Sequence, residues 1–183
     1  MDDDKARRAV AFLERAEGLK DTLRSGYTAA GRTEDTASHT WRLCLWLVLF
    51  GDAVEGLDQT RAMKMAVIHD LGEVISGDIP AIHQVGDKSA EERADFSALL
   101  GDIDDADAML ELWDEYEAGE TLEARVVKGL DKLETILQHS QGQNPPDFDY
   151  AFNLGYGADR TDKHAVLRQL RVILDEKTRS RMG

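Results

Sequence analysis

Prolines interrupt helices, and in this chain of 183 residues they occur at only two places, Pro80 and the pair Pro145–Pro146. Elsewhere apolar residues recur at helical spacing, as between residues 121 and 139, where most lie three or four positions apart. No segment alternates polar and apolar residues strongly enough to predict a β-strand. The sequence therefore predicts an all-α fold, with residues 1–183 forming a single-domain helical bundle of about six to eight helices.

Capping residues and glycines set the expected helix boundaries. Helices are expected near residues 5–19, 36–50, 58–72, 104–117, 121–139 and 163–178, and one more begins at Ser89. Residues 36–50 are apolar nearly all round, which predicts a central position in the fold. Gly26 and Gly31 are expected to bracket a loop, and residues 76–80 and 142–157 are expected to form two others.

Acidic residues outnumber basic residues by 36 to 22, which gives a formal net charge of −14. This charge argues against binding to nucleic acid, whose backbone requires clustered Lys and Arg. The longest apolar run, residues 43–50, is far shorter than the ~20 residues of a membrane span. The N-terminus has no apolar signal segment, and the single cysteine, Cys44, fits a reducing compartment. We expect a cytoplasmic protein with no membrane or nucleic-acid partner.

His69 and Asp70 stand side by side at the end of a strongly apolar helical stretch. An imidazole and a carboxylate in such surroundings are costly unless a partner compensates them, and a divalent cation would do so. His39 lies upstream and Asp131 downstream, on two other expected helices. The four side chains form a mixed nitrogen and oxygen set that suits Mn, Fe, Co, Ni or Zn rather than Ca.

The resemblance of this chain to a known family rests on short motifs in a fixed order. They are Arg24-Ser25-Gly26-Tyr27, Arg32-Thr33-Glu34, Ala37-Ser38-His39-Thr40, His69-Asp70-Leu71-Gly72-Glu73, Gly77-Asp78-Ile79-Pro80 and Asp131-Lys132-Leu133-Glu134. This pattern resembles the HD-domain superfamily of metal-dependent phosphohydrolases, in the branch that contains the 5′-deoxynucleotidases. The resemblance covers roughly residues 5 to 175. It places the core motifs within 24–134 and a C-terminal loop and helix within 141–180.

The resemblance implies His39, His69, Asp70 and Asp131 as ligands of one divalent metal ion, which could be Mn, Co, Mg, Fe, Ni or Zn. A site with two metals normally needs extra histidines between the His-Asp pair and the last Asp, and only His83 lies there. One departure is visible: the residue before the first ligand is usually acidic in this branch, and here it is Ser38. A carboxylate that would support the metal site is therefore missing at that position.

The resemblance also implies roles for two more acids and for groups that bind substrate. Glu73 is expected to transfer protons, and Asp78 to act as a second catalytic or substrate-orienting carboxylate. The alternative for both is an ordinary solvated loop acid. Substrate contacts are expected from Arg24, Arg32 and Lys132, which would bind phosphate, and from Tyr27, which could stack on a base. Arg32 could equally pair with Glu34 or with a helix end, and Tyr27 could equally pack in the core.

The leading functional hypothesis is a phosphomonoesterase that converts nucleoside or deoxynucleoside 5′-monophosphates to nucleoside and phosphate. The alternatives are hydrolysis of another small phosphate ester or a cyclic nucleotide, and non-catalytic binding of metal or nucleotide. A di-iron oxygenase is disfavoured because the additional histidines are missing. A homodimer is plausible. The loop at residues 144–150 could cover a pocket, form a dimer contact or simply connect two helices.

Overall fold

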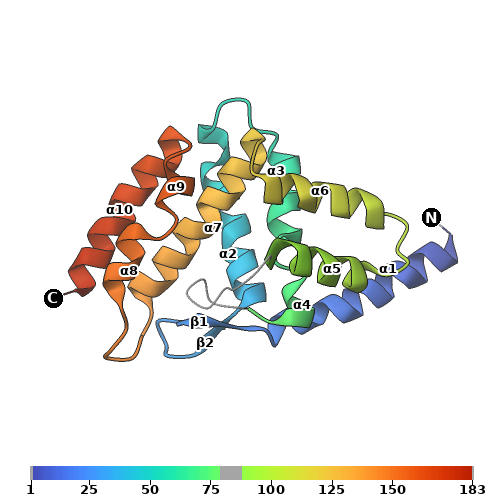
Figure 1. Ribbon diagram of the computed structural model, residues 1–183, viewed down its shortest axis with the longest axis horizontal. Helices are drawn as coiled ribbons and strands as arrows, with labels where there is room; N and C mark the ends of the chain where they lie inside the picture. The colour runs from blue at the N-terminus through green and yellow to red at the C-terminus, as the bar shows by residue number, and fades with distance from the viewer. Residues whose placement is uncertain (1, 79–87, 183) are drawn as a thin grey trace.

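The computed structural model describes residues 2–78 and 88–182, and most of these residues are helical (Figure 1). The helices of ten residues or more are α1 (Asp3–Ala16), α2 (Thr36–Phe50), α3 (Gln59–Ile68), α5 (Lys88–Leu100), α6 (Ala106–Ala118), α7 (Leu122–Gln141) and α10 (Ala165–Arg181). Short helical turns are η1 (Glu17–Lys20), η2 (Gly51–Ala53), α4 (Glu73–Ser76), α8 (Tyr150–Gly155) and α9 (Ala158–Thr161). The predicted all-α class is confirmed. None of the described helices combines the length and apolar character needed to cross a membrane.

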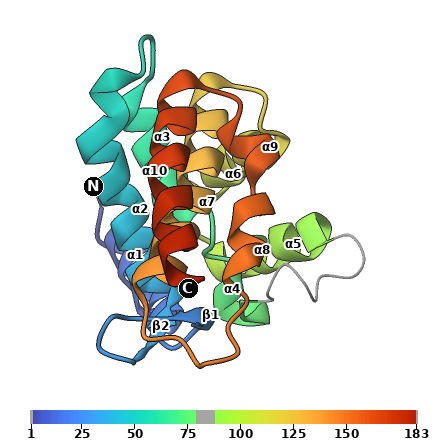
Figure 2. The ribbon, with the colours of Figure 1, turned by 90° about the vertical axis from the view of Figure 1, so that its left-hand side faces the viewer.

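Helix α7 is the centre of the bundle, because α2, α3, α6, α8, α9 and α10 all pack against it. In Figure 2, α2 lies on one side of the molecule and α8 and α9 lie on the other. Gly129 lets α10 approach α7 closely, since a Cβ atom at this position would collide with the side chain of Leu167. The segment predicted to be central, α2, packs on α7 by one face only. Trp41, Val48 and Leu49 on its other face are exposed.

Two short antiparallel strands, β1 (Leu23–Tyr27) and β2 (Thr33–Asp35), precede α2, so the prediction of no strand was wrong here. The hairpin has no alternating apolar pattern because it packs polar side chains inward. Glu34 on β2 is buried, for example. At the turn, Thr28 N donates to Arg32 O at 2.7 Å, and Gly31 has a φ of 82°, which favours glycine.

Three of the expected helices begin at a side chain that accepts a backbone hydrogen bond. Asp35 accepts from Ser38 N at 2.7 Å, Asp58 from Arg61 N at 2.9 Å, and Thr121 from Ala124 N at 3.2 Å. These bonds fix the first turns of α2, α3 and α7. Helix α2 contains the predicted ligand His39 and α7 contains Asp131. Helix α3 ends immediately before the His69-Asp70 pair.

The end of α3 and the content of one expected loop differ from the prediction. Helix α3 ends at Ile68 instead of near Gly72, and a turn leads into α4. Gly72 is needed there because a Cβ atom would lie 2.7 Å from the carbonyl oxygen of Glu92 in α5. The expected loop at 142–157 contains α8, whose first turn is capped by Asp149. Within the expected loop at 76–80, Gly77 and Asp78 are not helical. Ile79 and Pro80 of that motif, and His83, lie outside the described residues.

Candidate metal centre and active-site cavity

The structure brings the four predicted metal ligands together from α2, from the turn that follows α3, and from α7. His39 Nε2 lies 3.1 Å from Asp131 Oδ1 and 3.8 Å from Asp70 Oδ2. His69 Nε2 lies 3.0 Å from Asp70 Oδ2. The nitrogen and oxygen atoms that His39, His69 and Asp70 offer all lie within 4.8 Å of one another. Both imidazoles and Asp131 are buried.

His69 is held in place by contacts to backbone atoms. It follows the last residue of α3, and its Nδ1 atom donates to the carbonyl oxygen of Ala66 at 2.9 Å. The indole Nε1 of Trp113 donates to the carbonyl oxygen of His69 at 3.1 Å. The first bond fixes the ring orientation and leaves the Nε2 lone pair directed toward Asp70. The turn after α3 allows two adjacent residues to face the same point.

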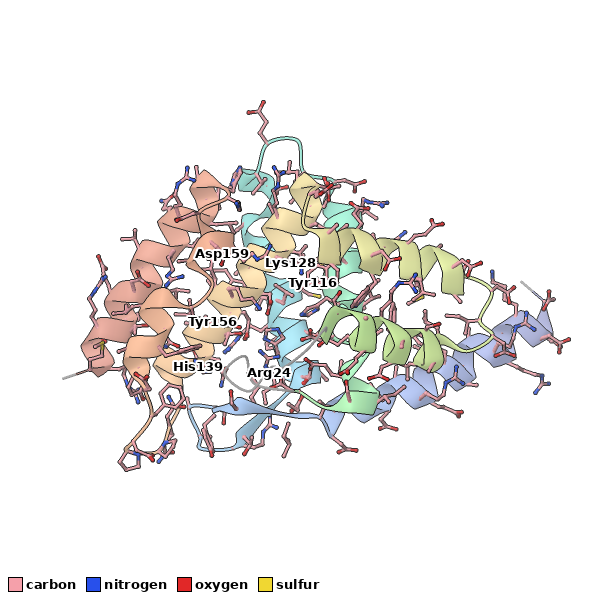
Figure 3. All side chains as sticks on the ribbon, in the orientation of Figure 1. Arg24, Tyr116, Lys128, His139, Tyr156 and Asp159 are labelled. Atoms are coloured by element: carbon pink, nitrogen blue, oxygen red, sulfur yellow. The ribbon has the colours of Figure 1, made fainter. Side chains whose placement is uncertain are left out.

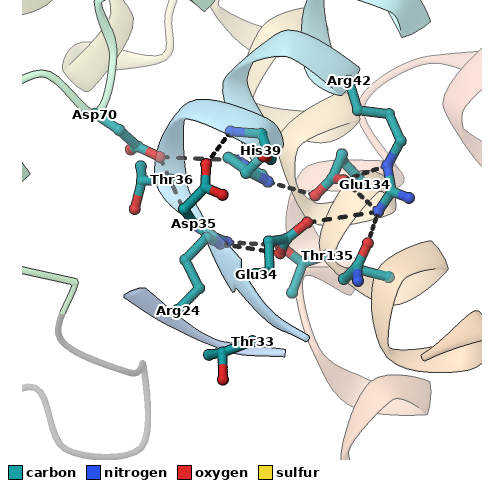
Figure 4. Close-up of polar contacts among 12 residues, drawn as sticks. Arg24, Thr33, Glu34, Asp35, Thr36, His39, Arg42, Asp70, Glu134 and Thr135 are labelled. Carbon is teal, nitrogen blue, oxygen red and sulfur yellow. Dashed lines mark hydrogen bonds and ion pairs between the residues drawn. The ribbon is translucent and has the colours of Figure 1, made fainter. Parts of the chain in front are cut away.

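His39 is supported by a buried carboxylate that the sequence reasoning missed (Figure 4). Its Nδ1 atom is hydrogen bonded to Glu134, which is fully buried on α7, and Arg42 Nε donates to Glu134 at 2.6 Å. Burial lowers the pKa of His39, but the carboxylates of Glu134 and Asp131 outweigh burial and raise the pKa to about 10. Glu134 thus provides a supporting carboxylate in a chain that has Ser38 before the first ligand.

The four donors fit a divalent cation. Within the described residues, His39 Nε2 and His69 Nε2 are buried without a hydrogen-bond partner, and both lie beside carboxylates. Burial opposes ionisation of Asp70, but its histidine neighbours and Arg24 hold the pKa below the usual value. The Asp70 carboxylate is therefore anionic at neutral pH and can serve as a ligand. Two imidazole nitrogens and two carboxylates match the predicted ligand chemistry.

A second cluster of possible ligands, made of Glu34, His39 and Glu134, lies on the other side of the His39 ring. It is already occupied by arginines: Arg24 Nε lies 3.5 Å from Glu34, and Arg42 binds Glu134. Burial and the nearby Glu134 raise the pKa of Glu34 to about 7. These contacts favour the single metal ion expected from the sequence.

The two predicted catalytic acids lie close to this centre and line the same cavity. Glu73 begins α4 and is buried, and one of its carboxylate oxygens accepts a hydrogen bond from Thr36 Oγ1 at 3.2 Å. Asp78 is half-buried and follows Gly77, whose φ is 76°. The alternative of a fully solvated loop acid therefore does not describe Glu73.

The predicted substrate contacts divide into two groups. Arg24 and Lys132 line the cavity: Arg24 Nη1 lies 3.5 Å from Asp70 Oδ2, and Lys132 Nζ lies 2.8 Å from Asp131 Oδ2. Arg32 and Tyr27 are not among the cavity-lining residues. Arg32 is exposed and pairs with Asp35 at 2.8 Å, because it sits at the turn of the hairpin and points along β2. A substrate contact for Arg32 or Tyr27 is therefore not supported by their positions.

The cavity has a volume of about 900 Å³ and opens between α5 and α6 on one side and α8 and α9 on the other (Figure 3). The metal ligands His69, Asp70 and Asp131 form part of its wall. Its outer walls include aromatic, proline and charged residues that the sequence reasoning did not assign to the site. They are Tyr116, Glu117, Lys128, His139, Pro145, Asp147, Phe148, Asp149, Phe152, Tyr156, Asp159 and Arg160. For the residues after Gly142, the sequence signal was the loop at residues 144–150, which was expected to cover a pocket, form a dimer contact or connect two helices. Tyr116, Glu117, Lys128 and His139 lie on α6 and α7 instead.

The comparison with protein families agrees with this geometry. The HD domain family model matches residues 16–171, which include all four candidate ligands. This chain belongs to the HD domain family. The predicted membership of the HD-domain superfamily is therefore confirmed, and the paired His69 and Asp70 are the doublet from which the resemblance was recognised.

Several HD-domain relatives are similar over most of the chain. The human protein "5′-deoxynucleotidase HDDC2" is 32% identical over 143 residues, which cover 74% of this chain and 69% of the relative. The Schizosaccharomyces pombe protein "5′-deoxynucleotidase hdd1" is 32% identical over 149 residues, covering 75% of this chain and 74% of the relative. The crystal structure of a predicted metal-dependent phosphohydrolase from Magnetospirillum magnetotacticum superposes with a TM-score of 0.80, 28% identity and 96% coverage of both chains.

Proposed function

We propose that this HD-domain protein is a metal-dependent phosphomonoesterase that hydrolyses nucleoside 5′-monophosphates, with a preference for the deoxy forms. The observation that carries the proposal is a pair of buried imidazole nitrogens, His39 Nε2 and His69 Nε2, which have no hydrogen-bond partner among the described residues and lie beside Asp131 and Asp70 at a cavity. The deoxynucleotide preference comes from the relatives that are named 5′-deoxynucleotidases.

When bound by these four ligands, a divalent metal ion supplies a Lewis acid and a water of lowered pKa. The chain's own residues supply charge and proton transfer. Arg24 lies 3.5 Å from Asp70 and lines the cavity, so its guanidinium can bind phosphate oxygens beside the metal centre. Glu73 and Asp78 reach the same cavity, and we assign them to proton transfer and to orientation of the reacting water or sugar.

The charge of the cavity favours monophosphates over di- and triphosphates. Among the described residues that line the cavity, nine are acidic and four are Lys or Arg. A single divalent cation, Arg24 and Lys132 would compensate the charge close to the candidate ligands, and Arg160 pairs with Asp159 at 3.2 Å, but Asp147 and Asp149 also line the cavity. Each further phosphate of a nucleotide would add negative charge near these exposed carboxylates, and the resulting repulsion should weaken as salt is added.

The test is phosphate release from ribo- and deoxynucleoside 5′-mono-, di- and triphosphates, after chelation and separate re-addition of Mn, Co, Mg, Fe, Ni or Zn. We expect release that one or more of these ions restores, that is highest for deoxynucleoside monophosphates, and that Asp131→Asn abolishes. No release from any nucleotide, with metal demonstrably bound, would contradict the proposal. Cyclic nucleotides and other small phosphate esters would then be assayed in the same way.

We also propose a homodimer that forms through the outward face of α2. Trp41, Leu45 and Val48 follow one another at helical spacing and are 65%, 38% and 63% exposed. The one Lys or Arg in α2, Arg42, turns inward to Glu134. In a chain of net charge −14, two copies meet with least repulsion where neither presents a charge. Pairing of this face with itself satisfies two-fold symmetry and leaves the cavity beside α8 and α9 open.

A further inference from the structure

A partly exposed aromatic ring on α8 lines the same cavity as the two predicted catalytic acids. Phe152 on α8 lines the cavity and is 38% exposed, although large apolar side chains gain free energy when they leave water. Its ring centroid lies 5.2 Å from that of Tyr156, and the two planes are inclined by 32°. Phe148 lines the cavity nearby and is packed on His139, with centroids 5.0 Å apart.

This aromatic wall is linked to a metal ligand through a single side chain. Lys132 Nζ lies 2.8 Å from Asp131 Oδ2 and 5.3 Å from the centroid of the Tyr156 ring. The Tyr156 ring is therefore contacted by the ammonium group of Lys132 and by the ring of Phe152. Phe152 is the member of this pair that keeps the larger free surface, and it faces the same cavity as Asp131.

The backbone that carries the aromatic wall is held by hydrogen bonds from a neighbouring helix and from a cap. Arg171, buried on α10, donates at 2.8 Å to the carbonyl oxygens of Asn153, Leu154 and Tyr156. The N-terminus of α8 is capped by Asp149, which accepts from Phe152 N at 3.2 Å. A platform fixed in this way loses little conformational entropy on binding.

We propose that Phe152, with Tyr156 behind it, is the platform on which the planar heterocyclic base of the substrate stacks while its phosphate lies at the metal centre. This inference rests on the proposed function and adds the site that recognises the nucleoside part. An aromatic face accepts every base, because all bases have a π surface. The platform therefore selects nucleotides over simple sugar phosphates and discriminates weakly among bases.

The proposal separates two ligands that share a phosphate and a sugar but differ in the base. Deoxyadenosine 5′-monophosphate carries a base, and deoxyribose 5-phosphate does not. We would measure equilibrium binding of both ligands by calorimetry, in the presence of the metal ion that the protein retains, for the wild-type residue at position 152 and for Phe152→Trp, Phe152→Leu and Phe152→Ala. All four chains would also carry Glu73→Gln, which we expect to keep the metal and stop turnover, so that the nucleotide survives the titration. Where turnover is observed, kcat/KM would be measured for the same pairs.

We expect the wild-type chain to bind the nucleotide more tightly than the sugar phosphate. Affinity for the nucleotide should follow the order Trp and Phe, then Leu, then Ala, with a loss of about 5- to 100-fold in Phe152→Ala. Affinity for deoxyribose 5-phosphate should stay within about twofold throughout. Val172→Ala, which shortens a 58% exposed apolar side chain on α10, is the matched control and should change the affinity for neither ligand.

The platform proposal would be overturned if the wild-type chain bound the two ligands with equal affinity. It would also be overturned if Phe152→Ala lost the same factor of affinity for both ligands. An unchanged nucleotide affinity in Phe152→Ala would overturn it as well. Because binding is measured directly, the result does not depend on turnover. A chain that binds nucleotide through Phe152 but releases no phosphate would contradict the proposed function and still support the platform.

Discussion

The Nδ1 atom of His39 is hydrogen bonded to the fully buried carboxylate of Glu134, and the opposite ring nitrogen lies 3.1 Å from Asp131 Oδ1. One side of the imidazole is thus held by the protein, and the other is available to a metal ion. Arg42 holds Glu134 in turn, at 2.6 Å. Burial tends to raise the pKa of Glu134, but His39 and Arg42 outweigh it and keep the pKa below its ordinary value.

Replacement of Glu134 by glutamine should weaken metal binding. The amide keeps the shape of the side chain but removes the charge that orients His39 and increases its basicity, so we expect affinity to fall by about 10- to 100-fold. A competition titration against a fluorescent chelator measures this change. Glu176→Gln, an exposed acid on α10, is the matched control. Equal metal affinity in Glu134→Gln and the control would show that His39 needs no such support.

Replacement of Glu73 by glutamine should separate metal binding from turnover. Glu73 lines the cavity without belonging to the ligand set, so we expect full metal content and a kcat lower by about 100- to 10,000-fold. Asp131→Asn should lose metal and activity together. Metal analysis of both purified variants, with steady-state kinetics, distinguishes the two classes. Turnover near the wild-type rate in Glu73→Gln would remove this residue from proton transfer.

Replacement of Arg24 by alanine should mainly raise KM, by about 10- to 100-fold, because a charged hydrogen-bond donor beside the phosphate is lost. Metal content must be checked, since Arg24 also lies 3.5 Å from Asp70. Arg32→Ala is the control on the same hairpin: its side chain is exposed and outside the cavity, so kinetics should not change. A rise in KM in Arg32→Ala comparable to that in Arg24→Ala would restore the original prediction for Arg32.

A glutamate on the outward face of α2 should dissociate the proposed dimer. We expect Trp41→Glu to raise the dimer dissociation constant by at least about 30-fold, because a large apolar anchor is replaced by a charge that meets its own copy. Sedimentation velocity over a range of concentrations measures this constant. Val172→Glu on α10 places the same charge on another exposed apolar site and should leave the dimer intact. A wild-type chain that stays monomeric at every concentration contradicts the proposal.

The candidate metal centre could be proposed from the sequence because its chemistry is concentrated in one pair. His69 and Asp70 are adjacent, and the motifs around His39 and Asp131 follow the same order as in the HD-domain family. The hairpin and α8 were missed for a physical reason. Their residues carry no strong periodic pattern, and they form by packing against α7 and by caps such as Asp149.

The sequence by itself determined the all-α class, most of the helix positions and the residue types of the candidate metal centre, because these depend on local spacing and on the chemistry of individual side chains. Only the tertiary structure decided which charges meet. It turned Arg42 inward to Glu134, left Arg32 outside the cavity, and brought Phe152 and Tyr156 from the C-terminal region to the wall shared with Asp131. Such contacts join residues that are distant in the chain, so they depend on how the helices pack around α7, which no local pattern specifies.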